Sequence, residues 1–330
     1  MNKIMLIYFV CAIALTFVLT VLISRRLIPA LKSHKMGQKI LEVGPRWHKN
    51  KEGTPTMGGL AFILSSTVTM AAAVVVSSIR GELAASAPLI ITYVMALLNG
   101  VIGFLDDYVK FFKKQNEGLS AKQKYLLQLV VSGGYLFAMY IAGAINTELY
   151  IPFFKTTIDF GIMYWFIAII ALTGIINAVN LTDGIDGLAS SVTFVVGAFF
   201  AVQAFVLSSF ETSLIAALII GSCLGFLVYN FYPARVFMGD TGSLFLGGLV
   251  IGCAFLIKNP LIIIVAGLVY LCEAVSVTLQ VAYFKLTHGK RLFKMAPIHH
   301  HFEKCGWSEI KIVSVFSLVT LAMCAIAMLG

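Results

Sequence analysis

The chain has 330 residues, of which 59% are hydrophobic and only 12% are charged. The charged fraction is far below that of an ordinary soluble domain, which argues against a soluble protein. The formal net charge of +9 does not indicate nucleic acid, because basic loops beside membrane spans account for it. We therefore predict an all-α polytopic membrane protein that forms a single integral membrane domain over residues 1–330.

Ten apolar stretches are long enough to cross a bilayer as helices, and their continuity argues against a β-barrel. They cover residues 4–24, 58–79, 89–105, 125–145, 161–179, 188–208, 213–229, 243–257, 261–284 and 312–329. The first stretch is too long for a signal peptide and carries no small-residue cleavage site. Residues 146–160 alternate aromatic, β-branched and polar residues, which predicts a small β-hairpin between the fourth and fifth spans.

The lysines and arginines decide the predicted orientation of these spans. Of the 24, 20 lie on one side of the membrane, in the loops at residues 25–57, 106–124, 180–187, 230–243 and 285–311. The positive-inside rule makes this side cytoplasmic and puts both termini outside. All six histidines and five of the six aspartates lie on the same side, although aspartates contribute little to topology. An active site formed by the five cytoplasmic loops accounts for them.

The run VNLTDGIDGL at residues 179–188 joins the fifth span to the sixth. It carries Asn180, Asp183 and Asp186, and the two aspartates share a face if the run is helical. Ionised carboxylates at a membrane boundary are costly unless something binds them, and a divalent metal that carries phosphates is one such partner. A capped polar turn between two helices explains the same residues without a ligand.

The run Asp106-Asp107-x-x-Lys110 closes the third span, and Asp106 and Lys110 are one helical turn apart. Adjacent carboxylates repel each other, so that the pKa of one should rise unless a cation lies near. Such a pair suits a general base or a metal-supporting site at the membrane surface. The structural alternative is a solvated helix end with an ion pair.

The run FMGDTGS at residues 237–243 places Asp240 among glycines just before the eighth span. Glycines allow a ligand to approach the backbone, and the start of the following helix favours an anion. Asp240 could therefore ligate Mg²⁺, and Phe237 could stack on a nucleobase. An aspartate helix cap and a membrane-facing aromatic are the alternatives for these two residues.

Three consecutive histidines, His299, His300 and His301, stand in the last polar loop. Neighbouring residues of a helix point in different directions, and no cysteine ligand lies nearby, which argues against a zinc site. Contacts from these histidines to phosphate or sugar oxygens fit the residue types better.

Two other cytoplasmic loops offer further candidate phosphate contacts. These are Lys51 and Thr56 in the first loop and Lys122 in the second, although each lysine alone is also explained by topology. Glu273 lies inside the ninth span. It is either paired within the bundle or marks a substrate groove, and the sequence leaves both interpretations open.

Together these stretches resemble the polyprenyl-phosphate N-acetylhexosamine-1-phosphate transferases. The resemblance rests on DDYVK (106–110), NLTDGIDGL (180–188), FMGDTGS (237–243) and the ten-span layout. Within that superfamily, TPTMGG (54–59) and PIHHHFE (297–303) are similar to the phospho-N-acetylmuramoyl-pentapeptide transferase branch. The similarity extends from about residue 45 to residue 311, and several separate motifs occur in the same order.

The resemblance implies transfer of phospho-N-acetylmuramoyl-pentapeptide from its UDP carrier to undecaprenyl phosphate, with lipid I and UMP as products. It also implies Mg²⁺ as cofactor, a role in peptidoglycan synthesis, and the bacterial inner membrane as location. The alternative is a UDP-N-acetylglucosamine:polyprenyl-phosphate N-acetylglucosamine-1-phosphate transferase, which the PIHHHFE run disfavours. Direct attack by the lipid phosphate and a phospho-sugar intermediate on an aspartate remain two open mechanisms.

By motif position, the resemblance also implies roles for individual residues. Asp106 is the leading candidate base, with Asp107 beside it, and Asp240 is the principal Mg²⁺ ligand. Asp183 is the second implied metal ligand, and Phe237 would contact the uracil. The other implied substrate contacts are Lys51, Thr56, Lys110, Lys122, Asn180, Asp186, Asn230, His299, His300 and His301. Small residues within spans, such as Gly197 and Gly221, could support helix packing in a homodimer.

Overall fold

The structure is a computed structural model that describes residues 3–33, 51, 53–81, 86–112 and 118–330. Parts of two predicted cytoplasmic loops, residues 34–50, 52 and 113–117, lie outside the described residues, as do residues 82–85 of an outer loop. Every residue predicted to belong to the site is described.

Ten long helices within the described residues are each long and apolar enough to cross a membrane. They are α1 (Lys3–Ser33), α2 (Gly59–Ile79), α3 (Ala87–Phe112), α4 (Ala121–Ile141), α5 (Met163–Thr182), α6 (Leu188–Leu207), α7 (Phe210–Asn230), α8 (Gly239–Leu256), α10 (Leu268–Leu286) and α12 (Glu309–Ala327). The shorter elements are η2 (Pro260–Ile262), α9 (Ile263–Ala266) and α11 (Ile298–Lys304). The all-α polytopic architecture with ten spans is confirmed.

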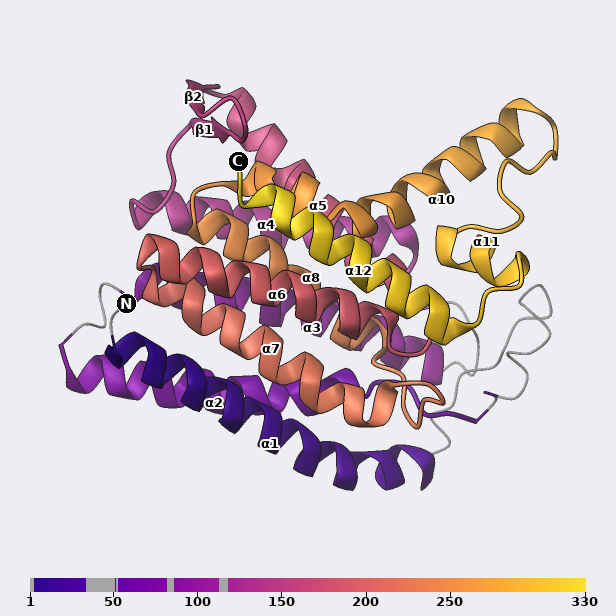
Figure 1. Cartoon of the computed structure of the whole chain (residues 1–330), viewed down its shortest axis with the longest axis horizontal. Coiled ribbons are helices and arrows are strands. Elements are labelled where there is room, and N and C mark those ends of the chain that lie inside the picture. Colours follow the sequence, from indigo (N-terminus) through magenta and orange to yellow (C-terminus); the bar gives the residue numbers. More distant parts are fainter. Residues whose placement is uncertain (1–2, 34–50, 52, 82–85, 113–117) are drawn as a thin grey trace.

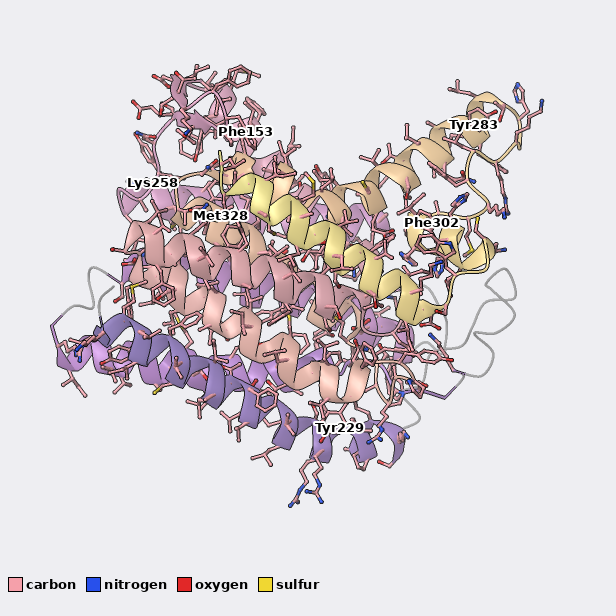
Figure 2. All side chains as sticks on the ribbon, in the orientation of Figure 1. Phe153, Tyr229, Lys258, Tyr283, Phe302 and Met328 are labelled. Carbon is pink, nitrogen blue, oxygen red and sulfur yellow. The ribbon has the colours of Figure 1, made fainter. Side chains whose placement is uncertain are left out.

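The predicted hairpin is also present. Strands β1 (Glu148–Ile151) and β2 (Thr156–Asp159) pair antiparallel. Figure 1 shows this hairpin, the start of α1 and the end of α12 toward one end of the bundle, and α11 toward the other. In Figure 2, Phe153, Lys258 and Met328 lie at the hairpin end, whereas Phe302 lies at the opposite end. The start of α1 and the end of α12 therefore lie toward the same end of the bundle.

The core of the bundle is formed by α7 and α8, which are the most buried of the spans. In contrast, α1 leaves apolar side chains such as Ile7, Val10 and Leu22 more than half exposed. Exposed apolar side chains on an outer helix are expected where hydrocarbon, rather than water, surrounds the protein. The polar motifs are concentrated where the central helices begin and end.

Small residues let α3 and α8 approach closely at the end that carries the motifs. A Cβ atom at Gly103 of α3 would overlap the backbone carbonyl of Asp240, and a Cβ at Gly59 of α2 would overlap Gly242 of α8. Close backbone contact of this kind is a main source of helix association in a bilayer, where apolar burial contributes little. It sets the last turns of α3 directly on the first turn of α8.

Replacing Gly103 with alanine is expected to lower both the thermal stability and the activity of the protein. The new methyl group would meet backbone atoms of Asp240 and Thr241, which cannot rotate away. Overpacking of this kind costs about 1–3 kcal/mol. Thermal unfolding in detergent measures the loss, with Gly133→Ala as control, because a Cβ there meets nothing within 4 Å. Equal melting temperatures for the two variants would contradict the proposed contact.

Four predicted spans differ most from the structure, and the first of them, predicted to end at residue 24, continues as helix to Ser33. The third span continues as helix to Phe112, and the eighth begins at Gly239, so the motif aspartates lie on helices rather than in loops. Apolar runs mark the hydrocarbon layer, whereas helices extend beyond it wherever the backbone hydrogen bonds continue. The predicted ninth span is interrupted, because its first residues form η2 and α9, and α10 begins only after Gly267. In Figure 1, α10 then diverges from α12.

Gly197 and Gly221, which the sequence offered as possible support for a homodimer, instead pack against helices of the same chain. A Cβ at Gly197 of α6 would meet Ile219 of α7 at 2.6 Å, and a Cβ at Gly221 of α7 would meet the carbonyl of Ile13 of α1 at 2.8 Å. These small residues therefore explain packing inside the bundle. A homodimer stays a prediction without their support.

Candidate active site

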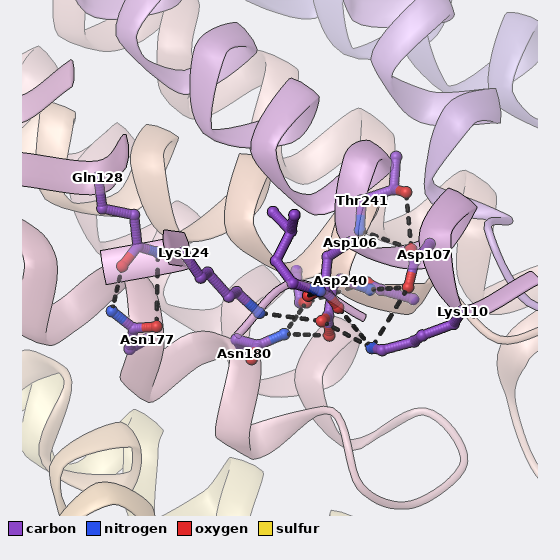
Figure 3. Close-up of polar contacts among 12 residues, drawn as sticks. Asp106, Asp107, Lys110, Lys124, Gln128, Asn177, Asn180, Asp240 and Thr241 are labelled. Atoms are coloured by element: carbon purple, nitrogen blue, oxygen red, sulfur yellow. Dashed lines mark hydrogen bonds and ion pairs between the residues drawn. The ribbon is translucent and has the colours of Figure 1, made fainter. Parts of the chain in front are cut away.

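Three carboxylates meet where α3 ends and α8 begins. One oxygen each from Asp106, Asp107 and Asp240 lies within 4.8 Å of the others. Asp106 and Asp107 are buried, and Asp240, in the first turn of α8, is partly exposed. Figure 3 shows the three side chains converging from the two helices. This acidic cluster joins two motifs that the sequence presents as separate.

Two lysines neutralise part of the acidic cluster. The Nζ atom of Lys110 lies 2.6 Å from Asp106 Oδ2 and 2.9 Å from Asp240 Oδ2. The Nζ atom of Lys124 lies 2.9 Å from the same Asp240 oxygen. Three carboxylates thus face two ammonium groups in a largely buried place. The remaining negative charge favours a cation, because a charge is costly in a buried place unless it is paired.

Lys124 is a site residue that the sequence reasoning missed, since it singled out Lys122 on the same turn. Lys122 is exposed, whereas Lys124 is partly buried and reaches Asp240. Gln128 and Ser132, the next residues on that face of α4, are fully buried. A polar stripe that repeats every four residues through an apolar helix marks an inward face, and that spacing is the signal that could have identified Lys124.

Asn180 reaches the acidic cluster from α5. Its Nδ2 donates to Asp240 Oδ1 at 2.8 Å and to Ser243 Oγ at 2.7 Å. One turn earlier on α5, Asn177 Nδ2 donates to Gln128 Oε1 of α4 at 2.7 Å, as Figure 3 shows. This amide pair ties α4 to α5 next to the residues that contact Asp240. The predicted site role of Asn180 therefore has a specific geometry, in which it orients Asp240.

The adjacent aspartates have different partners. Asp106 Oδ1 accepts from the backbone N–H of Leu119 at 2.9 Å. Asp107 Oδ2 accepts from the backbone N–H of Thr241 at 2.9 Å and from its hydroxyl at 2.7 Å, and Oδ1 accepts from the N–H of Asp240 at 3.3 Å. Asp107 thus caps α8 from a neighbouring helix, and its charge suits the positive end of the helix dipole.

Replacing Asp107 with alanine is expected to destabilise the protein by about 1–2 kcal/mol, the typical cost of losing a helix N-cap. Two backbone N–H groups and the Thr241 hydroxyl would lose their acceptor. Thermal unfolding in detergent measures the effect, with Thr241→Val removing only the hydroxyl bond as a milder comparison. An inactive Asp107→Ala variant of unchanged stability would instead assign Asp107 to the chemistry alone.

A second charged network lies around Lys51. Its Nζ atom is 2.7 Å from Asp186 Oδ1 and 2.7 Å from Glu309 Oε2. Asp186 also accepts from the backbone N–H of Ala234 at 2.8 Å and donates its own N–H to Glu309 at 3.0 Å. The network ties four segments of the chain together. Glu309, at the start of α12, was not predicted as a member of the site, because the sequence analysis considered the aspartates of the cytoplasmic loops and not this glutamate.

The loop before α2 pairs with the loop before α8 through backbone hydrogen bonds. Phe237 donates to Pro55 at 2.8 Å and accepts from Gly58 at 2.8 Å. This pairing fixes the half-buried ring of Phe237 and brings Thr56 beside Gly239 at the edge of the acidic cluster. Asn230 is buried and donates to the Val236 carbonyl at 3.0 Å. It therefore shapes the Phe237 loop from inside.

The three consecutive histidines point to three different partners. His299 Nδ1 lies 3.0 Å from Glu273 Oε2, and both side chains are fully buried. His300 Nδ1 lies 2.6 Å from Glu303 Oε2, and His301 Nδ1 accepts a backbone N–H at 3.1 Å. Among the residues that the structure describes, the group that could hold a metal contains aspartates rather than these histidines.

Asp183 follows the last residue of α5, outside the three-residue acidic cluster. Burial raises the pKa of its carboxyl group well above the ordinary value, and the negative charges of Asp240, Asp107 and Asp186 raise that pKa further. The pKa of the Asp183 carboxyl group therefore depends on the charge of the acidic cluster. A cation bound between Asp183 and Asp240 would favour its ionised form.

The residues present fit a divalent cation that prefers oxygen ligands. Asp106, Asp107 and Asp240 offer carboxylate oxygens within 4.8 Å of one another, and when ionised these three carboxylates outnumber the two lysine ammonium groups. Mg²⁺ binds through one or two carboxylates together with substrate phosphates. The donor set therefore suits Mg²⁺ better than a softer metal, which prefers thiolate or imidazole ligands.

Comparison with known proteins gives consistent matches. The Glycosyl transferase family 4 model matches residues 89–258, and the phospho-N-acetylmuramoyl-pentapeptide-transferase signature 1 matches residues 51–63. The chain is 46% identical over 320 residues to the phospho-N-acetylmuramoyl-pentapeptide-transferase of Clostridium acetobutylicum, covering 97% of this chain and 98% of the relative. For the enzyme of the same name from Clostridium novyi, identity is 46% over 319 residues, 97% of this chain and 95% of the relative. The chain belongs to the phospho-N-acetylmuramoyl-pentapeptide-transferase family.

Proposed function

We propose that this protein transfers phospho-N-acetylmuramoyl-pentapeptide from its UDP carrier to undecaprenyl phosphate, which gives lipid I and UMP for peptidoglycan synthesis. The observation that carries the proposal is the acidic cluster with its two lysines, located at the ends of membrane-spanning helices. A lipid phosphate and a soluble nucleotide can meet only at a membrane surface, and both are anionic. Such a reaction needs cationic groups at that surface.

The bond changes are those of a phosphoryl transfer. An oxygen of the lipid phosphate attacks the sugar-linked phosphorus of the donor, and the bond from that phosphorus to the bridging oxygen breaks, so UMP leaves with that oxygen. When bound, Mg²⁺ would neutralise charge on the pyrophosphate and on the departing UMP. We assign Asp240 as its principal ligand and Asp183, outside the acidic cluster, as a second ligand. A bound cation would favour the ionised form of the Asp183 carboxyl group, whose pKa is raised by burial and by the neighbouring aspartates.

The proposed role of Asp106 follows from its contact with Lys110 and from the acidity of the lipid phosphate that it would face. A phosphate monoester is already largely ionised near neutral pH, since its second pKa is about 6. A strong base is therefore not required, and Asp106 acts by holding Lys110 at 2.6 Å and by orienting the lipid phosphate. Direct attack is the preferred route. Labelled phospho-sugar trapped on the protein without lipid acceptor would support the covalent route instead.

The remaining residues proposed for donor binding lie around the acidic cluster and around the charged network of Lys51, Asp186 and Glu309. Phe237 is proposed to contact the uracil, because its ring is half-buried on a loop fixed by backbone pairing. The other proposed contributors to donor binding are Lys51, Thr56, Lys110, Lys122, Asn180, Asp186, Asn230, His299, His300 and His301. Lys51, Asp186, Asn230 and His299 contribute by fixing loops rather than by touching the substrate, since their partners belong to the chain itself.

The proposed setting is the bacterial inner membrane, with the acidic cluster on the cytoplasmic face and both termini outside. The concentration of lysine and arginine in the loops at that end supports this orientation. It also agrees with a donor that is a soluble cytoplasmic nucleotide. Cysteine reactivity toward an impermeant reagent at Cys305, which is exposed, tests it, since labelling should occur only after the cytoplasmic side is opened.

The proposed function is tested by comparing two donors in detergent with undecaprenyl phosphate and Mg²⁺. UMP release and a lipid-linked phospho-N-acetylmuramoyl-pentapeptide, identified by mass spectrometry, are expected with UDP-N-acetylmuramoyl-pentapeptide. UDP-N-acetylglucosamine should neither react nor compete. Turnover with UDP-N-acetylglucosamine alone would assign the sister activity, N-acetylglucosamine-1-phosphate transfer.

A further inference from the structure

A fully buried pair, Glu273 of α10 and His299 of α11, lies next to the site but outside the acidic cluster. His299 Nδ1 is 3.0 Å from Glu273 Oε2, and the backbone N–H of His299 faces the same oxygen at 3.4 Å. The buried residues of α10 end at Ser276, so the pair sits just before the helix leaves the bundle. Figure 2 shows Tyr283 beyond that point.

The contacts assign a tautomer to His299. Glu273 Oε2 receives the backbone N–H of His299, and as a carboxylate oxygen it can only accept, so the ring donates to it from a protonated Nδ1. In the neutral ring the other nitrogen, Nε2, is free of a proton. Nε2 is buried and has no hydrogen-bond partner within the described residues. A proton on that nitrogen would be a buried donor without an acceptor, which is costly.

The proton-free edge of the ring lies against Gly184. A Cβ atom at Gly184 would overlap Nε2 and would come within 2.5 Å of Cε1 of His299. Gly184 has no left-handed backbone that would require glycine, unlike Gly187 with φ of +76°. The ring of His299 is therefore the reason for the missing side chain at Gly184. That glycine directly follows Asp183 and precedes Asp186 by two positions.

The short helix α11 is itself held firmly. The ring of Phe302 packs against Phe316 of α12 with centroids 5.8 Å apart and against Trp307 at 4.7 Å. Figure 2 labels Phe302 in α11, beside α12. His299 thus stands on a fixed element. A side chain on a rigid support can position a loop that it touches.

We propose that Glu273 and His299 are positioning residues, and that Glu273 holds His299 in the Nδ1–H tautomer with its proton-free edge packed on Gly184. The packing fixes the turn that carries Asp183 and Asp186. This gives Glu273 a role in the site although it lies inside a membrane span, and it gives His299 a role without substrate contact. The kinetic part of the inference rests on the proposed function, whereas the tautomer does not.

The tautomer is measured directly by NMR of the full-length protein labelled with ¹⁵N-histidine, with His299 assigned from the signals that His299→Asn lacks. Wild-type protein should show a protonated Nδ1 and a proton-free Nε2 for this ring. Glu273→Gln should keep that pattern, because the amide oxygen can still accept from Nδ1. A proton on Nε2 in the wild type would overturn the proposal even if the enzyme is active.

The functional consequence is measured as kcat and as the Mg²⁺ concentration for half-maximal rate. Glu273→Leu should lower kcat or metal affinity by about 10- to 100-fold, as the loss of an orienting partner does in other sites, and Glu273→Gln should restore most of it. Gly184→Ala should behave like Glu273→Leu. Gly174→Ala is its control, because a Cβ at Gly174 meets nothing within 4 Å.

A merely structural role is excluded by a matched variant on the same helix. Tyr270→Phe removes a buried hydrogen bond of 2.8 Å from Tyr270 to Thr193 and should lower stability without moving the metal dependence. If it changes the metal dependence as much as Glu273→Leu, or if Glu273→Leu keeps wild-type kinetics, the positioning role is wrong. Failure of the wild type with both donors would overturn the proposed function, while the NMR result still decides the tautomer.

Discussion

Replacing Asp240 with asparagine is expected to lower kcat by about a thousandfold, or about 4 kcal/mol of transition-state stabilisation. Asp240 receives three donors, with Asn180 on Oδ1 and both Lys110 and Lys124 on Oδ2. An asparagine in the same place directs its own NH₂ group either at Asn180 or at the two ammonium groups. No orientation of the amide satisfies all three donors, and the charge that would hold the metal is lost.

The measurement is UMP release at saturating donor across a range of Mg²⁺ concentrations. The control is Asp159→Asn in β2, an exposed carboxylate on the hairpin at the other end of the bundle. It should keep wild-type kinetics. A loss of less than tenfold in Asp240→Asn, with unchanged metal dependence, would remove Asp240 from the centre of the site.

Replacing Lys124 with methionine is the second change with a large expected effect, a loss of about a hundredfold in kcat. One ammonium group would then face three carboxylates, which leaves buried charge without a partner. Any phosphate bound at the cluster would also lose a cationic contact. Single-turnover release of UMP separates this effect from donor binding.

Lys122→Met provides the matched comparison, because Lys122 lies on the same turn of α4 but is exposed. This variant should raise the KM for the nucleotide donor, because a phosphate contact is lost, and should leave kcat nearly unaltered. If Lys122→Met lowers kcat more than Lys124→Met does, the phosphate contact belongs to Lys122, which the sequence predicted, rather than to Lys124, which reaches Asp240.

The ten spans and the aspartates of the site could be predicted because both follow from local chemistry. A helix in a bilayer needs a continuous apolar run, so the number of spans can be counted from the sequence. Carboxylates such as Asp106 and Asp240 stand out because hydrocarbon makes them costly. That reasoning singled out candidate site residues without stating which of them contact one another.

The contacts could not be predicted, since they depend on how each helix is rotated and how closely it approaches its neighbours. Asp106 and Asp107 are chemically identical neighbours, and only the packing of α3 on α8 makes Asp107 the helix cap. The rotation of α4 about its own axis turns Lys124, and not Lys122, toward Asp240. The pairing of Glu273 with His299 joins α10 to α11, and neither this contact nor the break before α10 is visible in an unbroken apolar run.

The most direct test of this account is electron paramagnetic resonance of Mn²⁺, used in place of Mg²⁺, on wild type and Asp240→Asn in the presence of the UDP-linked donor. Wild-type protein should bind one ion with magnetic coupling to donor phosphorus, and Asp240→Asn should lose both. Equal Mn²⁺ affinity and equal phosphorus coupling in the two proteins would contradict the assignment of the metal to the acidic cluster.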